Sequence, residues 1–300
     1  MKNILFRGIM PALVTPYDEN RRLNRSAVGA LMDMEYAAGV HGFYINGSTG
    51  EGPVLSARLR MEMAEAAAEA NRGRGVIINH VGAPNFEDAR ALTLHARDLG
   101  VDAISSLIPS FYFSYTDDEI VDYYARLASL SDLPILVYAT PMIRSDVVGL
   151  MARLMAIPTV IGCKFTRYNY FEMSLVKMLC GGDINVINGP DEMLISGLAM
   201  GADGGIGTTY NIMPERYTAL YDAYQQGDTR RAREIQYGIN RVVDVLLKHG
   251  EGNAVKSTKA ALRLMGFDAG DAAYPARRTD AAALASLKAD LIAAGFEKCL

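Results

Sequence analysis

Two residues that could act together on a carbonyl compound stand at the ends of short apolar runs. Lys164 ends the run TVIGCK, residues 159–164, and Tyr138 ends the run PILVY, residues 134–138. Partial burial disfavours the charged form of an amine and so leaves more free amine to attack a carbonyl carbon. A phenol beside that amine could relay protons while a carbon–carbon bond breaks. The pair therefore indicates Schiff-base chemistry, although an exposed lysine and a packed tyrosine would fit the same two positions.

A glycine-rich loop follows another apolar run and is suited to holding a small anion. The loop reads NGSTGEG, residues 46–52, and leads into a predicted helix near residue 56. Its glycines allow a tight turn in which backbone N–H groups can converge on a carboxylate or a phosphate. Ser48 and Thr49 add two hydroxyl groups at the same place. Alone, a loop of this kind is a weak signal.

Two further strand ends carry polar residues. The segment NGPDE covers residues 188–192, and GGIGTTYN covers residues 204–211. Asp191 and Glu192 could accept hydrogen bonds from the hydroxyl groups of a ligand. Acidic residues at a helix N-terminus also interact favourably with the helix dipole, so a structural role is open as well.

The elements that must position these residues alternate along the chain as short apolar runs and helical patterns. The eight predicted strands cover residues 8–14, 42–45, 76–81, 102–107, 134–138, 159–164, 184–187 and 203–207. Nearly continuous apolar runs are typical of parallel strands that are covered on both faces. Eight repeats predict an α/β fold, a (β/α)8 or TIM barrel, and no GxGxxG motif supports a dinucleotide-binding sheet. The active site of such a barrel lies at the carboxyl ends of the strands, where Lys164 and Tyr138 would be neighbours.

Helical spacing supports this alternation. Apolar residues at i, i+3, i+4 and i+7 indicate helices packed on a sheet; two such sets are Val147, Leu150, Met151, Leu154 and Leu59, Met63, Ala66, Ala70. Thr116 and Glu119 form a capping box that begins another helix. After residue 212 the pattern predicts only helices, over residues 214–225, 229–249, 253–265 and about 279–295. We therefore expect a barrel over residues 1–225 and a C-terminal helical extension of the same domain over residues 226–300.

Composition and charge exclude several classes of protein. Of the 300 residues, 50% are hydrophobic and 21% charged, which suits a large core and not a disordered chain. A net charge of −4 gives no reason to expect nucleic acid, whose binders cluster lysine and arginine. We expect no membrane span, because no run of about 18 uncharged apolar residues occurs. We also expect no signal peptide, because Arg7 interrupts the apolar stretch at the start of the sequence. Three isolated cysteines and four scattered histidines predict no metal site and a reducing compartment, the cytoplasm.

Four of these segments carry a family resemblance. They are GSTGEG, VYATP, GCKFT and NGPDEMLISGLAMGADGGIGTTYNIMPERY, in this order along the chain. The chain resembles the N-acetylneuraminate lyase and dihydrodipicolinate synthase family of pyruvate-dependent class I aldolases, and the last segment is most similar to the lyases. The resemblance covers almost the whole chain. The combination of motifs is specific for the family and less specific for the substrate.

The resemblance implies a role for each matching residue. Lys164 would form the Schiff base with the 2-keto carbon, Tyr138 would relay protons, and no metal or organic cofactor would be needed. Tyr112, in PSFYFSY, would enter the active site of a neighbouring subunit, which implies a homo-oligomer, with a homotetramer expected. The other matches are to positions that bind a small 2-keto acid substrate: Ser48 and Thr49 for its carboxylate, and Thr166, Gly189, Asp191, Glu192 and Thr208 for the rest.

Some positions depart from the family pattern. Ala139 and Thr140 follow the tyrosine where the family usually has Asn-Ile, and Thr208 stands where the lyases typically have serine. Thr140 is smaller and more polar than isoleucine and could reshape the pocket. In dihydrodipicolinate synthases an arginine five residues after the tyrosine binds the carboxylate of the second substrate, but this chain has Ile143 there and Arg144 one residue later. A displacement by one residue can point a side chain elsewhere.

Three functions are open on these observations. The first is a lyase that cleaves N-acetylneuraminate, or a related 3-deoxy-2-keto sugar acid, to pyruvate and an aldehyde. The second keeps the Schiff base and changes the substrate, as in dihydrodipicolinate synthase or in a 2-keto-3-deoxy acid aldolase or dehydratase. The third is a keto-acid-binding protein without catalysis, against which the presence of both Lys164 and Tyr138 argues. The displaced Arg144 counts against the synthase, and NGPDE favours a polyhydroxylated substrate and hence the first function.

Overall fold

The computed structural model describes residues 6–109, 113–144 and 146–299 of the chain. The strands are β1 Gly8–Pro11, β2 Gly42–Ile45, β3 Val76–His80, β4 Ala103–Leu107, β5 Ile135–Ala139, β6 Val160–Phe165, β7 Asn185–Asn188 and β8 Gly204–Gly207. The barrel helices are α1 Arg25–Ala37, α2 Ala57–Asn71, α3 Phe86–Leu99, α4 Asp117–Ala128, α5 Val147–Leu154, α6 Tyr170–Lys177, α7 Leu194–Ala199 and α8 Pro214–Gln225. Short 3₁₀ helices are η1 Gly52–Val54, η2 Leu179–Gly182, η3 Asp191–Met193, η4 Thr209–Asn211 and η5 Glu297–Cys299.

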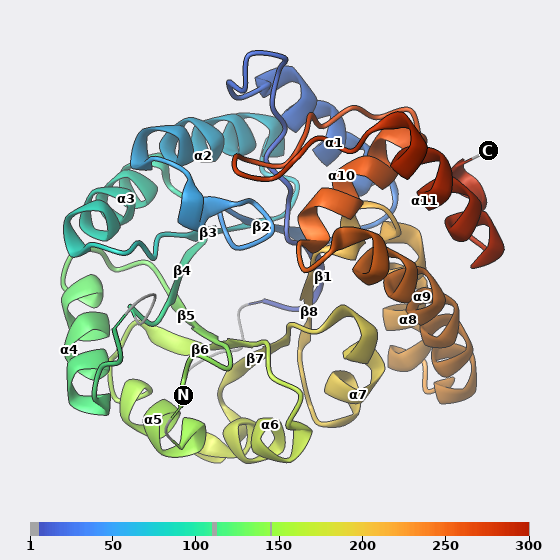
Figure 1. The fold of residues 1–300 in the computed structure, drawn as a ribbon. Helices are drawn as coiled ribbons and strands as arrows, with labels where there is room; N and C mark the ends of the chain where they lie inside the picture. The colour runs from blue at the N-terminus through green and yellow to red at the C-terminus, as the bar shows by residue number, and fades with distance from the viewer. Residues whose placement is uncertain (1–5, 110–112, 145, 300) are drawn as a thin grey trace.

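The eight strands surround a central axis, and the helices form an outer ring (Figure 1). Each strand from β2 to β8 pairs with the next one along the chain, and β8 also pairs with β1; all of these pairs are parallel. A parallel bridge between Ala12 and Tyr44 connects the two remaining strands, β1 and β2, and nearly closes the ring. The predicted TIM barrel is confirmed.

Side chains of the strands divide between two apolar layers. Along β5, Leu136 points into the barrel, while Val137 belongs to the larger layer between strands and helices. This alternation follows from the two-residue period of a strand, and burial on both sides explains the continuous apolar runs. Because Tyr138 has the same parity as Leu136, it also faces the barrel interior.

The boundaries differ slightly from those predicted. β1 ends at Pro11 and not at residue 14, since only the single bridge at Ala12 continues its pairing. In α2 the predicted stripe is rotated: Leu59 is only half-buried, whereas Arg60 is 2% exposed. Two backbone carbonyls, of His80 and Gly82, accept hydrogen bonds from the Arg60 guanidinium, which allows this charged residue to be buried.

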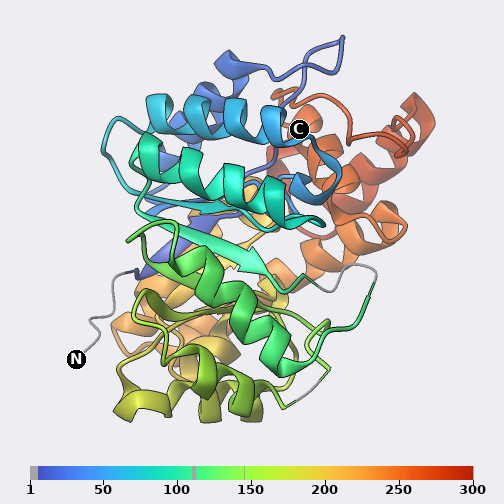
Figure 2. The same cartoon turned by 90° about the vertical axis from the view of Figure 1, so that its left-hand side faces the viewer.

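The C-terminal extension consists of α9 Thr229–Gly250, α10 Ala254–Leu264 and α11 Ala281–Ala293. These helices lie beside α1 and α8 in Figure 1, and Figure 2 shows them at the end of the barrel to which the strands point. The predicted boundary at residue 225 stays a prediction, although α8 does end at Gln225. Within the described residues, no helix is both long enough and apolar enough to cross a membrane.

The capping box predicted for α4 gives a first test. Thr116 Oγ1 accepts the backbone N–H of Glu119, and the Glu119 carboxylate accepts the N–H of Thr116 at 2.7 Å. We expect T116A to lower the free energy of unfolding by about 1 kcal/mol in urea denaturation, because one helix N–H loses its acceptor. T229A is the matched control, since Thr229 follows the N-cap Asp228 and does not cap α9 itself. Equal losses in both variants would contradict the capping role.

Candidate active site

The amine and the phenol predicted to act together are neighbours on adjacent strands. Lys164 on β6 pairs in register with Tyr138 on β5, and Lys164 Nζ lies 4.4 Å from the centre of the Tyr138 ring. The pairing shifts by one residue earlier in these strands, where Ile135 pairs with Val160 but Leu136 pairs with Gly162. This leaves one extra residue on β6, as in a β-bulge. Without that shift, Tyr138 would pair with Cys163 and not with Lys164.

Lys164 is 4% exposed and reaches into the barrel from the carboxyl end of its strand. Its Nζ also lies 4.5 Å from the centre of the Tyr44 ring. Aromatic faces attract a cation, so the two rings offset part of the cost of burying an ammonium group. Among the described residues, no carboxylate forms an ion pair with Lys164. The amine is therefore held by aromatic groups and not locked in a salt bridge.

The environment of Tyr138 favours its ionised form. Burial alone would raise the pKa of this phenol, but the positive charge of Lys164 and the hydroxyl group of Ser48 outweigh burial and lower the pKa. The Thr166 hydroxyl, which has no hydrogen-bond partner among the described residues, acts in the same direction. A phenol that loses its proton more readily is suited to accept a proton from a substrate hydroxyl.

Tyr44 is a member of the site that the sequence analysis missed. It lies on β2, is buried, and its hydroxyl donates a hydrogen bond to Ser105 Oγ at 3.0 Å. Burial and the nearby Tyr138 raise the pKa of Tyr44 well above its usual value, so this phenol keeps its proton. The sequence did contain a signal for Tyr44, because this residue lies near the carboxyl end of the second predicted strand, just before the glycine-rich loop.

The glycine-rich loop is tightly folded, but not by glycine dihedral angles. Its positive φ angles fall on Asn46, at 60°, and Glu51, at 59°. Gly52 is required for another reason: a Cβ atom there would lie 1.9 Å from the Asn46 carbonyl oxygen. Among the described residues, the backbone N–H groups of Ser48 and Thr49 have no hydrogen-bond acceptor. These two donors are thus available to an anion.

A cavity of about 280 Å³ brings most of the predicted residues together. Its lining includes Ser48, Thr49, Tyr138, Lys164, Thr166, Gly189 and Thr208. Thr49 Oγ1 and Thr208 Oγ1 lie 2.7 Å apart, so a hydrogen bond joins the loops after β2 and β8. Residues 252–255, at the turn into α10, form another wall of the cavity. These residues belong to the predicted C-terminal extension, which was not expected to contribute to the site.

Two predicted residues lie elsewhere. Asp191 is buried next to the cavity, where its Oδ2 accepts hydrogen bonds from the N–H and the hydroxyl of Thr209 at 2.6 and 2.7 Å. Glu192 accepts a hydrogen bond from the Tyr168 hydroxyl at 2.5 Å. Neither acid is among the residues that line the cavity. Tyr112 lies outside the described residues.

The departures after Tyr138 do not reshape the cavity directly. Thr140 Oγ1 accepts a hydrogen bond from the N–H of Met142, and neither Ala139 nor Thr140 lines the cavity. Ile143 is buried, whereas Arg144 is exposed and also absent from the lining. The displaced arginine is therefore not in place to bind a substrate carboxylate. Within the part of the chain that is described, no group of His, Cys, Asp or Glu residues could hold a metal ion.

Known proteins are similar to this chain in sequence and in fold. Residues 5–294 of the chain match the dihydrodipicolinate synthetase family. An N-acetylneuraminate lyase of Rhizobium meliloti (strain 1021) is 38% identical over 282 residues, which cover 94% of this chain and 93% of that protein. The structure of the Proteus mirabilis N-acetylneuraminate lyase superposes with a TM-score of 0.91 at 28% identity, over 97% of this chain and 99% of that one. A catalytic lysine mutant of the Ruminococcus gnavus sialic acid aldolase superposes with a TM-score of 0.90 at 28% identity, over 98% of both chains.

The environment of Asp191 predicts a pH effect on stability. Burial raises the pKa of Asp191 from 3.8 to about 6, against the hydrogen bonds from Thr209, which lower it. The folded state therefore favours the protonated acid. The resulting contribution of Asp191 to the free energy of unfolding is fully present below about pH 4 and is lost as the pH rises through about 6. We expect the wild type to lose up to about 3 kcal/mol of unfolding free energy relative to D191N between these pH values. Urea denaturation of both proteins at several pH values measures the difference, and a constant difference would contradict the buried, protonated acid.

Proposed function

We propose that this chain, which belongs to the dihydrodipicolinate synthetase family, cleaves N-acetylneuraminate to pyruvate and an aldehyde through a Schiff base on Lys164. The observation that carries the proposal is the buried Lys164 amine beside Tyr138 at the carboxyl end of the barrel. The relative that is 38% identical over nearly the full chain is an N-acetylneuraminate lyase. The protein is a class I aldolase, a carbon–carbon lyase.

The reaction begins with the free amine of Lys164. The amine attacks C2 of the open-chain acid, and loss of water gives an iminium. Tyr138 takes the proton of the C4 hydroxyl, the C3–C4 bond breaks, and its electron pair forms an enamine with the iminium. The enamine takes up a proton at C3, and water then releases pyruvate and regenerates the amine. Every atom comes from the substrate, water and the two side chains, so the chemistry needs no further cofactor.

The charge of the site suits this sequence of steps. The charge that lowers the pKa of Tyr138 is carried by the Lys164 nitrogen, which is also the nitrogen of the iminium. The phenol therefore remains next to a positive charge when it must accept the C4 proton. The free N–H groups of Ser48 and Thr49 would hold the carboxylate of the 2-keto acid, next to C2.

The position of Arg144 favours this proposal over dihydrodipicolinate synthesis. The resemblance assigns an arginine five residues after the tyrosine to the second substrate of the synthases, and that place holds Ile143. Arg144 is exposed outside the cavity. Asp191 and Glu192 stand at the carboxyl end of β7, the position that the resemblance assigns to sugar contacts, and we propose that they become contacts when substrate occupies the cavity.

We also propose that the protein is a cytoplasmic homotetramer in which Tyr112 serves a neighbouring active site. The support for the tetramer is the family resemblance around Tyr112. The support for the compartment is that Cys163 and Cys180 are free thiols, as is usual in a reducing environment.

Borohydride trapping tests the Schiff base. Reduction in the presence of pyruvate should add a pyruvate-sized mass to the Lys164 peptide of the wild type and none to K164R. Y138F should still be trapped, but its kcat for N-acetylneuraminate should fall by about 10²- to 10⁴-fold, because the proton acceptor is missing. Y237F, at an exposed position on α9, is the matched control and should keep wild-type kcat.

A substrate panel separates the alternatives. The proposal expects turnover of N-acetylneuraminate above that of 2-keto-3-deoxygluconate, and none of aspartate semialdehyde with pyruvate. An unmodified Lys164 peptide would refute the mechanism, and trapping without turnover of any substrate would indicate a binding protein.

Complementation between inactive variants tests the shared site. K164R and Y112F subunits, each with low activity alone, are unfolded together and refolded as a mixture. If Tyr112 serves a neighbour, a mixed pair contains one complete site, and random pairing should restore about a quarter of the wild-type activity. A mixture of K164R and Y138F is the control and should gain nothing, because both residues belong to the same subunit's site. No gain with Y112F would show that Tyr112 does not act across subunits.

A further inference from the structure

A buried ion pair connects the glycine-rich loop to the C-terminal extension. Lys259 Nζ lies 2.8 Å from Glu51 Oε2, and the two side chains are only 1% and 6% exposed. The same ammonium group donates to the carbonyl oxygens of Thr15, at 2.8 Å, and Asp271, at 3.1 Å. The other carboxylate oxygen, Glu51 Oε1, accepts the N–H of Ala273 at 2.5 Å. Segments from three distant parts of the chain therefore meet at this pair.

The loop needs such support where it carries Glu51. The φ of Glu51 is 59°, in the left-handed region, which costs a residue with a side chain about 1–2 kcal/mol. A residue keeps this conformation only where its surroundings hold it. Besides the ion pair, the hydroxyl of Thr15 donates to the Gly50 carbonyl oxygen at 2.6 Å. We call Thr15, Glu51 and Lys259 the loop anchor.

One face of α10 links the anchor to the active site. Val255, Lys259 and Arg263 are spaced by four residues and so lie along the same side of the helix. Val255 lines the active-site cavity, and Lys259 binds the loop. Arg263 pairs with Asp268 and with Asp271, the residue whose carbonyl oxygen Lys259 also binds.

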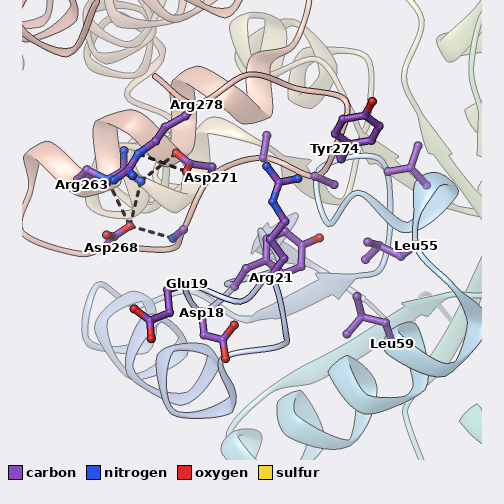
Figure 3. Close-up of a pocket in the computed structure, with 15 residues that line it drawn as sticks. Asp18, Glu19, Arg21, Leu55, Leu59, Arg263, Asp268, Asp271, Tyr274 and Arg278 are labelled. Carbon is purple, nitrogen blue, oxygen red and sulfur yellow. Dashed lines mark hydrogen bonds and ion pairs between the residues drawn. The ribbon is translucent and has the colours of Figure 1, made fainter. Parts of the chain in front are cut away.

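Residues that contact the anchor, namely Tyr17, Asp271 and Ala273, line a second cavity. Figure 3 shows Arg263 turned toward Asp268 and Asp271 on the wall of this outer cavity, which measures about 540 Å³. Tyr17 also lines the outer cavity, and its ring centre lies 4.0 Å from Lys259 Nζ. Burial and the charge of Glu51 raise the pKa of Tyr17, so the phenol stays neutral and Lys259 has Glu51 as its charged partner.

The energetics of a buried ion pair favour a geometric role. Removing two charges from water costs about as much as their mutual attraction returns, so such a pair adds little net stability. What it does fix is position, because the charges and their hydrogen bonds are satisfied in only one arrangement. In this chain the ion pair fixes the position of Glu51, which is two residues after Thr49 in the loop.

We propose that the loop anchor positions Ser48 and Thr49 to bind the carboxylate of the 2-keto acid. Glu51, within the loop, and Lys259, on α10, are then positioning residues, since neither lines the cavity. The C-terminal extension thereby becomes part of the catalytic unit. This inference rests on the proposed function, because it assigns the loop to the substrate carboxylate.

The test measures how tightly pyruvate is held and not only how fast a substrate is converted. The double variant E51Q/K259M removes both charges together and leaves neither buried alone. We expect the pyruvate concentration for half-maximal borohydride trapping to rise about tenfold, because a small misplacement of binding groups is costly, while saturating pyruvate still traps Lys164. K177M/D203N is the matched control: it removes the ion pair between Lys177 and Asp203, which precedes β8 at the opposite end of the barrel. It should change the thermal unfolding midpoint without changing half-saturation.

A second variant keeps the proposal testable if the double variant does not fold. T15V removes only the hydroxyl bond to Gly50 and keeps both charges, and it should raise half-saturation by a few fold. The positioning role of the anchor would be refuted if the pyruvate concentration for half-maximal trapping in E51Q/K259M equalled that of the wild type. If the double variant is unfolded, the same result in T15V would refute it. A wild type that pyruvate and borohydride do not modify would instead refute the proposed function, so the two failures are distinct.

Discussion

The register between β5 and β6 is the constraint on which the site depends. Paired residues of parallel strands point to the same side of the sheet, so Lys164 and Tyr138 share the barrel interior only in the observed register. The extra residue near Ile161 sets that register. Gly162, which follows it, has no room for a side chain, because a Cβ atom would lie 1.8 Å from the carbonyl oxygen of Asn185 on β7. The glycine two residues before the lysine thus serves the chemistry through strand packing.

The electrostatics of the interior follow from this placement. One amine enters a region lined by phenols, and no carboxylate among the described residues pairs with it. Tyr138 and Tyr44 are both buried, yet the pKa of Tyr138 is lowered and that of Tyr44 is raised. The difference arises because the charge of Lys164 lowers the pKa of Tyr138, whereas burial, together with the nearby Tyr138, raises the pKa of Tyr44. Two similar residues on the same inner face are thereby suited to different tasks, one to exchange a proton and the other to keep it.

Much of this arrangement could be predicted from the sequence. Eight apolar runs indicated the barrel, and the rule that strand ends form its active site brought Lys164, Tyr138 and the glycine-rich loop together. Apolar periodicity could not show the shift in register, because a single extra residue inside a buried strand leaves the apolar pattern unbroken. Burial of Arg60 was also missed, since it depends on carbonyl groups of β3 and its loop that become partners only in three dimensions. The walls of the cavity near Val255 depend on how the extension folds back, which local patterns do not contain.

The extension completes the site by a different kind of interaction from the barrel. Backbone hydrogen bonds between paired strands hold Lys164 and Tyr138 in place. A loop has no such ladder, and the loop after β2 keeps Glu51 in an unfavourable conformation. Side-chain contacts with other segments therefore hold its shape, and α10 contributes the buried ion pair between Lys259 and Glu51. The barrel positions the groups that form and break bonds, and the helix behind the loop positions the groups that hold the substrate.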